Sequence, residues 1–242
     1  MKTLAIMQPT YLPWLGFFDL MKRADLFILY DHVQYVKHSR NKVRNREGAI
    51  LLSVPVVHTG RVDVPINQVE IADRPNFRKK HLDTIRFNYC KAQNFKKYFG
   101  ELEAIYRKNH RLLVDLNYDL IFWGREKLGI TTELKRSSAL DIPKGGRVST
   151  IVSLCKQFGA QKYYSPMGAK AYIDEDNLFE QEGVILEYQR FEHPVHPQLH
   201  YDNFISHLSF IDFLFNVSEE DIQVWVEAPP LVACVPAEDH DG

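Results

Sequence analysis

The chain has 242 residues, of which 45% are hydrophobic, 25% charged and 12% aromatic, a composition that excludes disordered, collagen-like and coiled-coil proteins. Its formal net charge of −1 hides an asymmetry, because residues 217–242 carry seven acidic residues and no Lys or Arg. Residues 1–216 hold 30 basic residues against 24 acidic ones, and this mildly basic body favours an anionic ligand such as a phosphate or a nucleotide.

The sequence also limits the cellular compartment. Its three cysteines lie far apart, so neither a disulfide framework nor a thiolate metal site is indicated. The apolar start of the chain ends at Gln8-Pro9, which is too early for an export signal, and no run of about 18 apolar residues follows. We therefore expect a cytoplasmic protein without a membrane span.

The first elements form a strand–helix–strand unit. Residues 3–7 are an apolar run that Gln8-Pro9 ends, apolar residues recur at helical spacing over 14–24, and a second apolar run covers 26–30. A crossover of this kind joins parallel strands. The pattern predicts an α/β fold with a mostly parallel sheet covered by helices.

The middle of the chain first departs from this alternation. Residues 37–46 (KHSRNKVRNR) have almost no apolar content and predict a loop, whereas 49–57 and 68–71 are typical of two strands that pair with each other. From residue 74 to about 129 the apolar spacing is helical, and we expect three helices that form a covering layer or an insert.

Strand–helix alternation returns in the last part of the chain. The predicted elements are strands at 131–137, 162–165 and 184–188, and helices near 151–158, 174–181 and 209–215. We expect residues 1–217 to form one α/β domain and the acidic residues 218–242 to form a mobile tail.

A first candidate site lies between the first strand and the first helix, at residues 8–16 (QPTYLPWLG). In open α/β sheets, ligands bind at the carboxyl ends of strands, so Gln8, Tyr11 and Trp14 are candidate ligand-binding residues. Neither a G-x-G-x-x-G motif nor a P-loop motif occurs here. In the alternative interpretation, the two prolines only fix a turn and the aromatic side chains belong to the core.

A second candidate site follows the second strand. Asp31 comes directly after that strand, where a carboxylate is well placed to bind an amine or a sugar hydroxyl. The residues after it mix bidentate phosphate binders with side chains that hydrogen-bond sugars or bases. Our candidates are Gln34, Tyr35, Arg40, Asn41 and Arg44. A solvated basic loop is the structural alternative.

Two later segments add candidates. His193 and His196 lie in an extended His-Pro-Val-His-Pro-Gln segment that ends at Gln198, without the helical pair of a zinc motif, so we predict no metal and a neutral histidine as general base. Ser165 and Lys170 flank the turn after the strand at 162–165, where Lys170 is placed to hold a diphosphate.

These motifs resemble those of the WbqC-like family, whose members occur in bacterial O-antigen gene clusters. The resemblance runs from residue 3 to about 217 and is carried by residues 8–18, 30–35, 88–89, 164–168, 193–198 and 209–216. It implies a role in the biosynthesis of surface polysaccharides such as lipopolysaccharide, with transfer of a glycyl or another aminoacyl group to an amino sugar. Two features depart from the family pattern: His196 stands where the family favours tyrosine, and the loop after Lys37 is shorter.

The opening also looks distantly like that of nucleotidyltransferases and class I synthetases, which carry a histidine-x-glycine-histidine signature on this turn. The matching stretch here, Trp14–Phe17, lacks both histidines. Phosphate activation by that route is therefore not expected, because a similar fold does not by itself imply the same reaction.

Our leading hypothesis is a transferase that places an acyl or aminoacyl group on the amine of a nucleotide-linked amino sugar. His193 or His196 would remove the proton, Asp31 would orient the amine, and positive side chains would hold the diphosphate: Arg40, Arg44 or Lys170. The donor would be an activated acyl or aminoacyl compound, with aminoacyl-tRNA as one source, and no further cofactor is indicated. The alternatives are a non-catalytic protein that binds a nucleotide sugar or RNA, and a structural partner in polysaccharide assembly.

Overall fold

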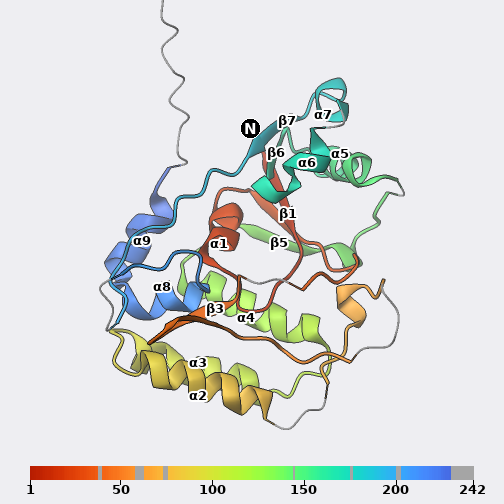
Figure 1. The fold of residues 1–242 in the computed structure, drawn as a ribbon. Coiled ribbons are helices and arrows are strands. Elements are labelled where there is room, and N and C mark those ends of the chain that lie inside the picture. Colours follow the sequence, from red (N-terminus) through yellow and green to blue (C-terminus); the bar gives the residue numbers. More distant parts are fainter. Residues whose placement is uncertain are drawn as a thin grey trace, which may run out of the picture.

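A five-stranded parallel sheet with the order β5-β2-β1-β6-β7 forms the centre of the computed structural model (Figure 1). The structure describes residues 1–37, 40–57, 63–72, 76–143, 145–174, 177–199 and 203–229. The strands of the central sheet are β1 (Thr3–Met7), β2 (Leu26–Leu29), β5 (Glu133–Arg136), β6 (Lys162–Ser165) and β7 (Ile185–Tyr188). Its neighbouring strands all pair in parallel, which confirms the predicted α/β fold.

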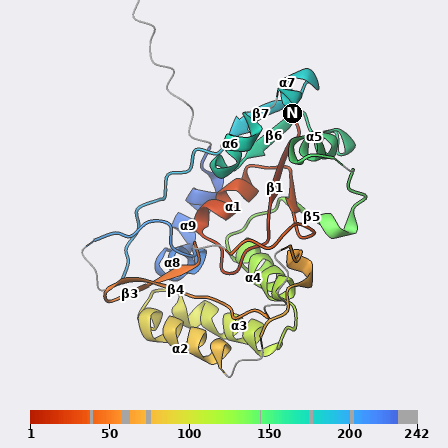
Figure 2. The same cartoon turned by 45° about the vertical axis from the view of Figure 1, so that its right-hand side comes forward.

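Helices cover both faces of this sheet because successive side chains of β1 and β2 point to opposite sides. Leu4 and Ile6 belong to one hydrophobic cluster, and Ala5 and Phe27 belong to the other. The face that carries Leu4 and Ile6 packs against α5 (Arg147–Gln157), α6 (Lys170–Ile173) and α7 (Leu178–Gln181). The face that carries Ala5 and Phe27 packs against α1 (Leu15–Lys22), α4 (Leu113–Lys127) and α8 (Phe210–Asn216) (Figure 2). No helix in the described ranges is long and apolar enough to cross a membrane.

The order of the strands creates a switch point between β1 and β6. From β1 the chain moves outward to β2 through α1, whereas from β5 it returns through α5 to the other side of β1 and adds β6. The two connections therefore leave the sheet in opposite directions at this position. Ligands of open α/β sheets bind at such a point, outside the carboxyl ends of the strands.

The three helices predicted between residues 74 and 129 are present, as α2 (Phe77–Tyr89), α3 (Phe95–Arg107) and α4. The expected loop at 37–46 is wrong in its second half, because Lys42–Asn45 form β3 and pair with β4 (Gly48–Leu51) in an antiparallel hairpin. Val43 of this hairpin is buried in the core that contains the helical layer. The loop was predicted from the high charge of this segment, but its packing against the rest of the protein favours a strand over that local pattern.

A second strand was expected at 68–71. The chain instead forms the short 3-10 helix η1 (Ile66–Gln68), followed by a single antiparallel bridge between Val56 and Ile71. Part of the predicted pairing is therefore present without the strand.

The acidic segment from residue 218 does not begin as a mobile tail, which corrects that expectation. Residues Glu219–Glu227 form α9, and the Ser218 side chain accepts a hydrogen bond from the Asp221 backbone N–H at 3.1 Å. Acidic residues in the first turn suit the positive end of a helix dipole. Ile222 is buried, and Trp225 packs against Phe213 of α8, with ring centroids 5.5 Å apart. Residues 230–242 lie outside the described part of the chain.

Candidate functional site

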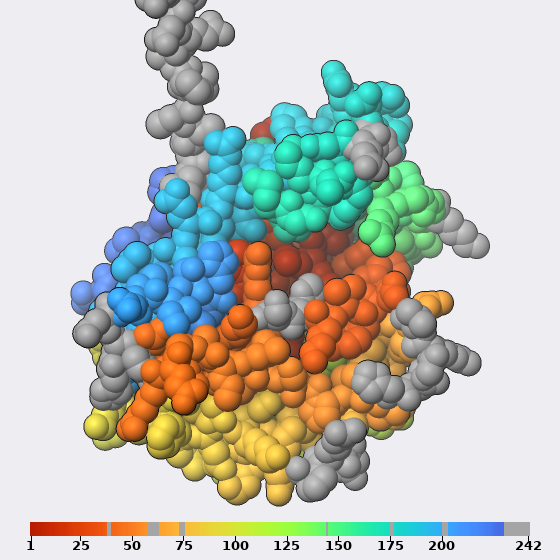
Figure 3. Space-filling model, viewed as in Figure 1, coloured from red at the N-terminus to blue at the C-terminus, as the bar shows by residue number. Residues whose placement is uncertain are grey.

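A cleft of about 880 Å³ opens at the carboxyl ends of β1, β6 and β7, at the switch point of the sheet. Figure 3 shows the hollow between the teal segment after β6 and the orange segment after β2, with red N-terminal residues at its floor. Its lining comes from five parts of the chain: Met7, Thr10, Tyr11 and Trp14; Lys37 and Arg40; Pro166–Ala169 and Tyr172; Gln189–Phe191; and His207.

The lining of the cleft is positively charged. Lys37, Arg40 and Arg190 belong to it, and no Asp or Glu stands among its described residues. None of the three takes part in an ion pair with another described residue. A recess lined by one sign of charge concentrates field lines and attracts ligands of the opposite sign. The cleft is therefore suited to an anion such as a diphosphate.

Trp14 forms the aromatic wall of the cleft. Its ring stacks on His207 at 5.0 Å and 13°, meets Phe191 edge to face at 5.1 Å, and lies 4.2 Å from the Arg40 guanidinium carbon. Gly16 makes room for this ring, because a Cβ atom at that position would lie 2.3 Å from the indole. The predicted residues Trp14 and Arg40 thus meet in one cleft.

The turn between β1 and α1 is fixed from behind by the helical layer. The Asn117 side chain donates to the Pro9 carbonyl at 3.0 Å, and the Tyr11 hydroxyl hydrogen-bonds His81 Nδ1 at 2.7 Å and the Tyr106 hydroxyl. Burial lowers the pKa of His81 to about 4, so this histidine is neutral at pH 7. Tyr11 lines the cleft, while its hydroxyl is engaged in this buried network.

Leu12 lies in the same turn and adopts φ 41°, a left-handed conformation that is uncommon for a residue with a Cβ atom. A strained backbone conformation of this kind persists only where surrounding contacts hold it in place, and such residues are common at ligand-binding sites. The contacts behind the turn supply that constraint.

Gln8 links the floor of the cleft to the segment that carries Lys37. Its side chain donates to the Gln34 carbonyl at 2.8 Å and accepts from the Val36 backbone N–H at 3.3 Å. Gln8 and Gln34, both predicted to bind substrate, are therefore placed to position Lys37, and neither lines the cleft itself.

A smaller recess of about 30 Å³ adjoins the cleft and shares three lining residues with it, Thr10, Tyr11 and Lys37. The predicted residues Tyr35 and Asn41 lie here, together with Asn117 of α4. The two hollows place most candidates from residues 8–41 around one region.

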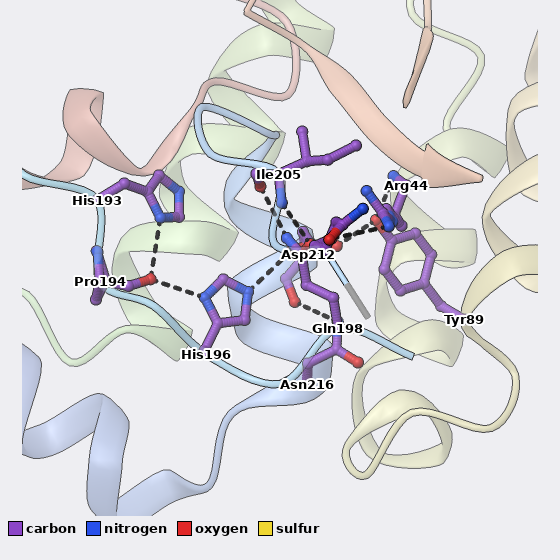
Figure 4. Close-up of polar contacts among 10 residues, drawn as sticks. Arg44, Tyr89, His193, Pro194, His196, Gln198, Ile205, Asp212 and Asn216 are labelled. Atoms are coloured by element: carbon purple, nitrogen blue, oxygen red, sulfur yellow. Dashed lines mark hydrogen bonds and ion pairs between the residues drawn. The ribbon is translucent and has the colours of Figure 1, made fainter. Parts of the chain in front are cut away.

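Three other predicted residues, Arg44, His196 and Gln198, meet in a buried network centred on Asp212 of α8 (Figure 4). Asp212 accepts hydrogen bonds from the Tyr89 hydroxyl at 2.7 Å and from the Gln198 side chain at 2.8 Å, and its carboxylate lies 2.9 Å from His196 Nε2. The Arg44 backbone N–H donates to the Tyr89 hydroxyl at 2.7 Å. This network joins β3, α2, the histidine segment and α8.

The network also engages both ring nitrogens of His196. Its Nδ1 lies 3.0 Å from the Pro194 carbonyl, and its Nε2 faces Asp212. His196 does not line the cleft. Its predicted role in proton transfer stays a prediction, and the contacts describe a residue that connects segments.

His193 lies between this network and the cleft. Its ring centroid is 5.7 Å from that of Phe191 and 6.1 Å from that of His207, and burial lowers its pKa to about 4. Among the described residues, the histidine that lines the cleft is His207, whose pKa is lowered by burial and, to a smaller extent, by the charge of Arg40.

Asp31 lies outside the cleft, at the carboxyl end of β2. Its carboxylate accepts hydrogen bonds from Ser137, from Ser138 and from the Tyr118 hydroxyl. Burial raises the pKa of Asp31, but these hydrogen bonds to the charged form outweigh it and leave the pKa below its usual value. In this environment Asp31 joins β2 to the 3-10 helix η2 (Ser137–Ala139) and to α4.

The turn after β6 contributes Pro166–Ala169 to the lining of the cleft. Ser165 is fully buried, and its carbonyl accepts from the Gln189 backbone N–H at 2.8 Å. Lys170 pairs with Asp174 and lies over the Tyr188 ring, 4.8 Å from its centroid, outside the lining. Of the candidates for holding a diphosphate, only Arg40 faces the cleft.

The sequence reasoning missed several cleft residues. Arg190 and Phe191 follow the strand at 184–188 directly, and the rule that ligands bind beyond parallel strands points to them. Lys37 lies in the predicted basic segment, and His207 is the last of four histidines between 193 and 207. The candidate segment at residues 8–16 and the basic segment after β2 therefore line the same cleft, and the histidine-rich stretch at 193–207 reaches it through His207.

Comparison with known proteins identifies the family. The model of the WbqC-like protein family matches residues 8–224, from the floor of the cleft to α9. The chain belongs to this family. A relative from Mycobacterium tuberculosis, the uncharacterized protein Rv1507c, is 33% identical over 225 residues, which cover 91% of this chain and 96% of the relative. No solved structure matches the chain significantly.

Proposed function

We propose that this WbqC-like protein is a transferase of surface-polysaccharide biosynthesis, which moves an acyl or aminoacyl group, such as glycyl, onto the amine of a nucleotide-linked amino sugar. The observation that carries the proposal is the cleft at the switch point, with Lys37, Arg40 and Arg190 and no acidic residue in its described lining. A nucleotide-linked sugar has the diphosphate that such a set of cations recognises.

The aromatic side of the cleft fits the rest of such a ligand. Trp14 and Phe191 offer apolar surface beside Arg40, and planar bases and the apolar faces of sugar rings pack on such surfaces. The combination of positive and aromatic side chains supports a ligand that carries both phosphate and a ring.

The chemistry requires a proton acceptor next to the amine. As the new bond between nitrogen and the acyl carbon forms and the bond from this carbon to the donor's leaving group breaks, the nitrogen loses a proton. His207 lines the cleft, and its lowered pKa keeps the imidazole uncharged at neutral pH. Lys37 and Arg190 are placed to stabilise negative charge that develops in the cleft. We assign the base to His207 rather than to His193 or His196, because these two do not line the cleft.

Isothermal titration calorimetry with inorganic diphosphate, UDP and UDP-glucosamine tests the binding part of this proposal. Replacing Arg40 or Arg190 by Ala removes a charge-assisted contact and should weaken diphosphate binding about tenfold or more. Arg107→Ala is the matched control, because Arg107 is 73% exposed on α3 and pairs with Glu103. Wild-type affinity in both cleft variants would contradict the proposed phosphate site.

Two further measurements separate the proposal from its alternatives. In His207→Ala the loss of acyl transfer, measured with activated donors, should far exceed the loss of affinity for UDP-glucosamine that follows from removing the ring stacked on Trp14; unchanged transfer would remove the role of His207. If RNA binds instead, and its affinity falls steeply with rising salt, the protein is a nucleic-acid-binding module.

A further inference from the structure

The helices α2 and α3 carry the positive charge of the protein body. Residues 77–108 hold nine Lys or Arg and three Asp or Glu, a surplus of six positive charges. Residues 1–216 as a whole have the same surplus, so the rest of the body is formally neutral. The segment 77–108 lies entirely within the described part of the chain, and none of its residues lines the cleft. A surplus concentrated on one layer indicates a large polyanion as partner, beyond the small anion of the cleft.

An aromatic side chain is exposed on this basic layer. Phe87 of α2 is 69% exposed and lines a groove of about 470 Å³ between α2 and the β3–β4 hairpin. The guanidinium carbon of Arg46 lies 5.8 Å from the centre of its ring. The other residues that line the groove are Asn45, Glu47, Ile50, Asp83, Thr84 and Asn88. An exposed ring beside a guanidinium is a surface on which the bases of single-stranded nucleic acids stack.

Three positive side chains surround this ring. Lys80 lies two turns before Phe87 on the same side of α2, Lys91 follows about one turn after it, and Arg46 comes from the hairpin. All three are exposed, and none forms an ion pair with another described residue. Asp83, one of the two acidic residues of the groove, is paired with Lys79. The free cations are therefore available to the phosphates of a nucleic acid.

The β3 strand connects this groove with the cleft. Arg40 lines the cleft and Arg46 lines the groove, and six residues of extended chain span at most about 20 Å. Figure 3 shows the orange residues of the hairpin between the hollow and the yellow helical layer. A single strand of a few nucleotides that lies in the groove therefore reaches the cleft with its end.

We propose that the groove beside Phe87 binds the single-stranded 3′ end of an RNA that carries the aminoacyl group as an ester, as aminoacyl-tRNA does. This inference rests on the proposed function, which requires an activated donor. In the transfer, the nitrogen of the amino sugar forms a bond to the carbonyl carbon of the ester, and the bond from this carbon to the ribose oxygen breaks. The ribose oxygen then receives the proton that the nitrogen loses.

A membrane with anionic lipids is the competing partner for a basic surface. Membrane-binding faces place several apolar side chains next to their cations, whereas the groove combines Phe87 with the polar side chains of Asn45, Thr84 and Asn88. These side chains can hydrogen-bond base edges and ribose hydroxyls, and lipid tails offer them no partner. The groove therefore favours RNA.

Fluorescence anisotropy with two labelled RNAs tests the inference. One is a hairpin with a short single-stranded 3′ extension that ends in CCA, and the other is the same hairpin with a blunt end. The wild-type protein should bind the extended RNA several-fold more tightly, with an affinity that falls as the salt concentration rises.

The variant Phe87→Ala removes the stacking surface and should weaken binding of the extended RNA about fivefold or more, with little effect on the blunt RNA. Val224→Ala is the matched control, because Val224 is 68% exposed on α9. Lys80→Ala and Lys91→Ala should each weaken RNA binding several-fold and reduce its salt dependence, whereas Lys156→Ala on α5 should not.

Equal affinity of the wild-type protein for the two RNAs, or unchanged binding in Phe87→Ala, would overturn the inference. Vesicles that contain phosphatidylglycerol test the competing partner: binding to them that is lost in the Lys80 and Lys91 variants, without binding of RNA, would also overturn it. Titration with inorganic diphosphate separates the two proposals, because the cleft is intact in all these variants and should bind it normally. Binding of diphosphate without RNA refutes this inference alone, and preferential binding of the extended RNA without diphosphate refutes the phosphate site alone.

Discussion

Replacing Gly16 by Ala should disturb the cleft through a single methyl group. The new Cβ atom would lie 2.3 Å from the Trp14 ring, whereas carbon atoms prefer a separation of about 3.5 Å or more, so the indole has to retreat by about 1 Å. This movement weakens the contacts of the ring with Phe191 and His207, about 0.5–1.5 kcal/mol each, and with Arg40, about 0.5–1 kcal/mol.

Part of this loss is offset, because Ala is favoured over Gly in a helix by about 0.5–1 kcal/mol. The free energy of unfolding should therefore fall by about 1–3 kcal/mol, and the affinity for UDP should fall as the aromatic wall moves. Guanidinium denaturation and calorimetric titration measure the two effects.

Gly100→Ala is the matched control, since nothing lies within 4 Å of a Cβ atom at that position of α3, and it should stabilise the protein slightly. If Gly16→Ala unfolds at the wild-type denaturant concentration and binds UDP normally, the reasoning about Trp14 is refuted.

Two further predictions concern the surroundings of the cleft. Burial lowers the pKa of His81 to about 4 from the ordinary value of 6.5, so the unfolded chain binds more protons than the folded chain between these two pH values. The free energy of unfolding should therefore fall by about 3 kcal/mol between pH 6.5 and pH 4 because of His81 alone. Urea denaturation at both pH values should show a smaller fall in His81→Gln. An equal loss in both proteins would contradict this. Gln8→Ala removes two hydrogen bonds that hold the segment before Lys37, so diphosphate affinity measured by calorimetry should fall several-fold, whereas Gln223→Ala on the exposed side of α9 should leave it unchanged. Equal affinities of these two variants would mean that Gln8 does not position Lys37.

The strands and helices around the sheet were predictable because their signals are local. The apolar runs at 3–7 and 26–30 and the apolar spacing of α1 follow from burial on both faces of a parallel sheet. The loop at residues 8–16, which carries Trp14 between the first strand and the first helix, then indicated the place of the cleft.

The partners of the site were not predictable because they depend on contacts between distant segments. The Asp212 carboxylate contacts the side chains of Tyr89, His196 and Gln198, and no periodicity in the sequence relates these positions. His207 lines the cleft and adopts a left-handed conformation with φ 61°, which no local sequence pattern around it predicts. Arg44, a candidate to hold a diphosphate, is instead buried, and its guanidinium donates to the Asn203 carbonyl at 3.0 Å.

The attachment of α8 to the beginning of the chain has a consequence for protein synthesis. The backbone N–H of Ser209 donates to the Lys42 carbonyl, and that of Phe210 donates to the Pro13 carbonyl, so the last third of the chain holds the first turn in place. At about 5–20 residues per second, a ribosome needs about 10–30 s to extend the chain from residue 42 to residue 209. During this interval Phe18, which is fully buried in the finished protein, lacks its packing partner Phe210, whose ring centroid lies 4.8 Å from its own. Chaperones that bind apolar segments near the tunnel exit therefore have their opportunity before α8 emerges.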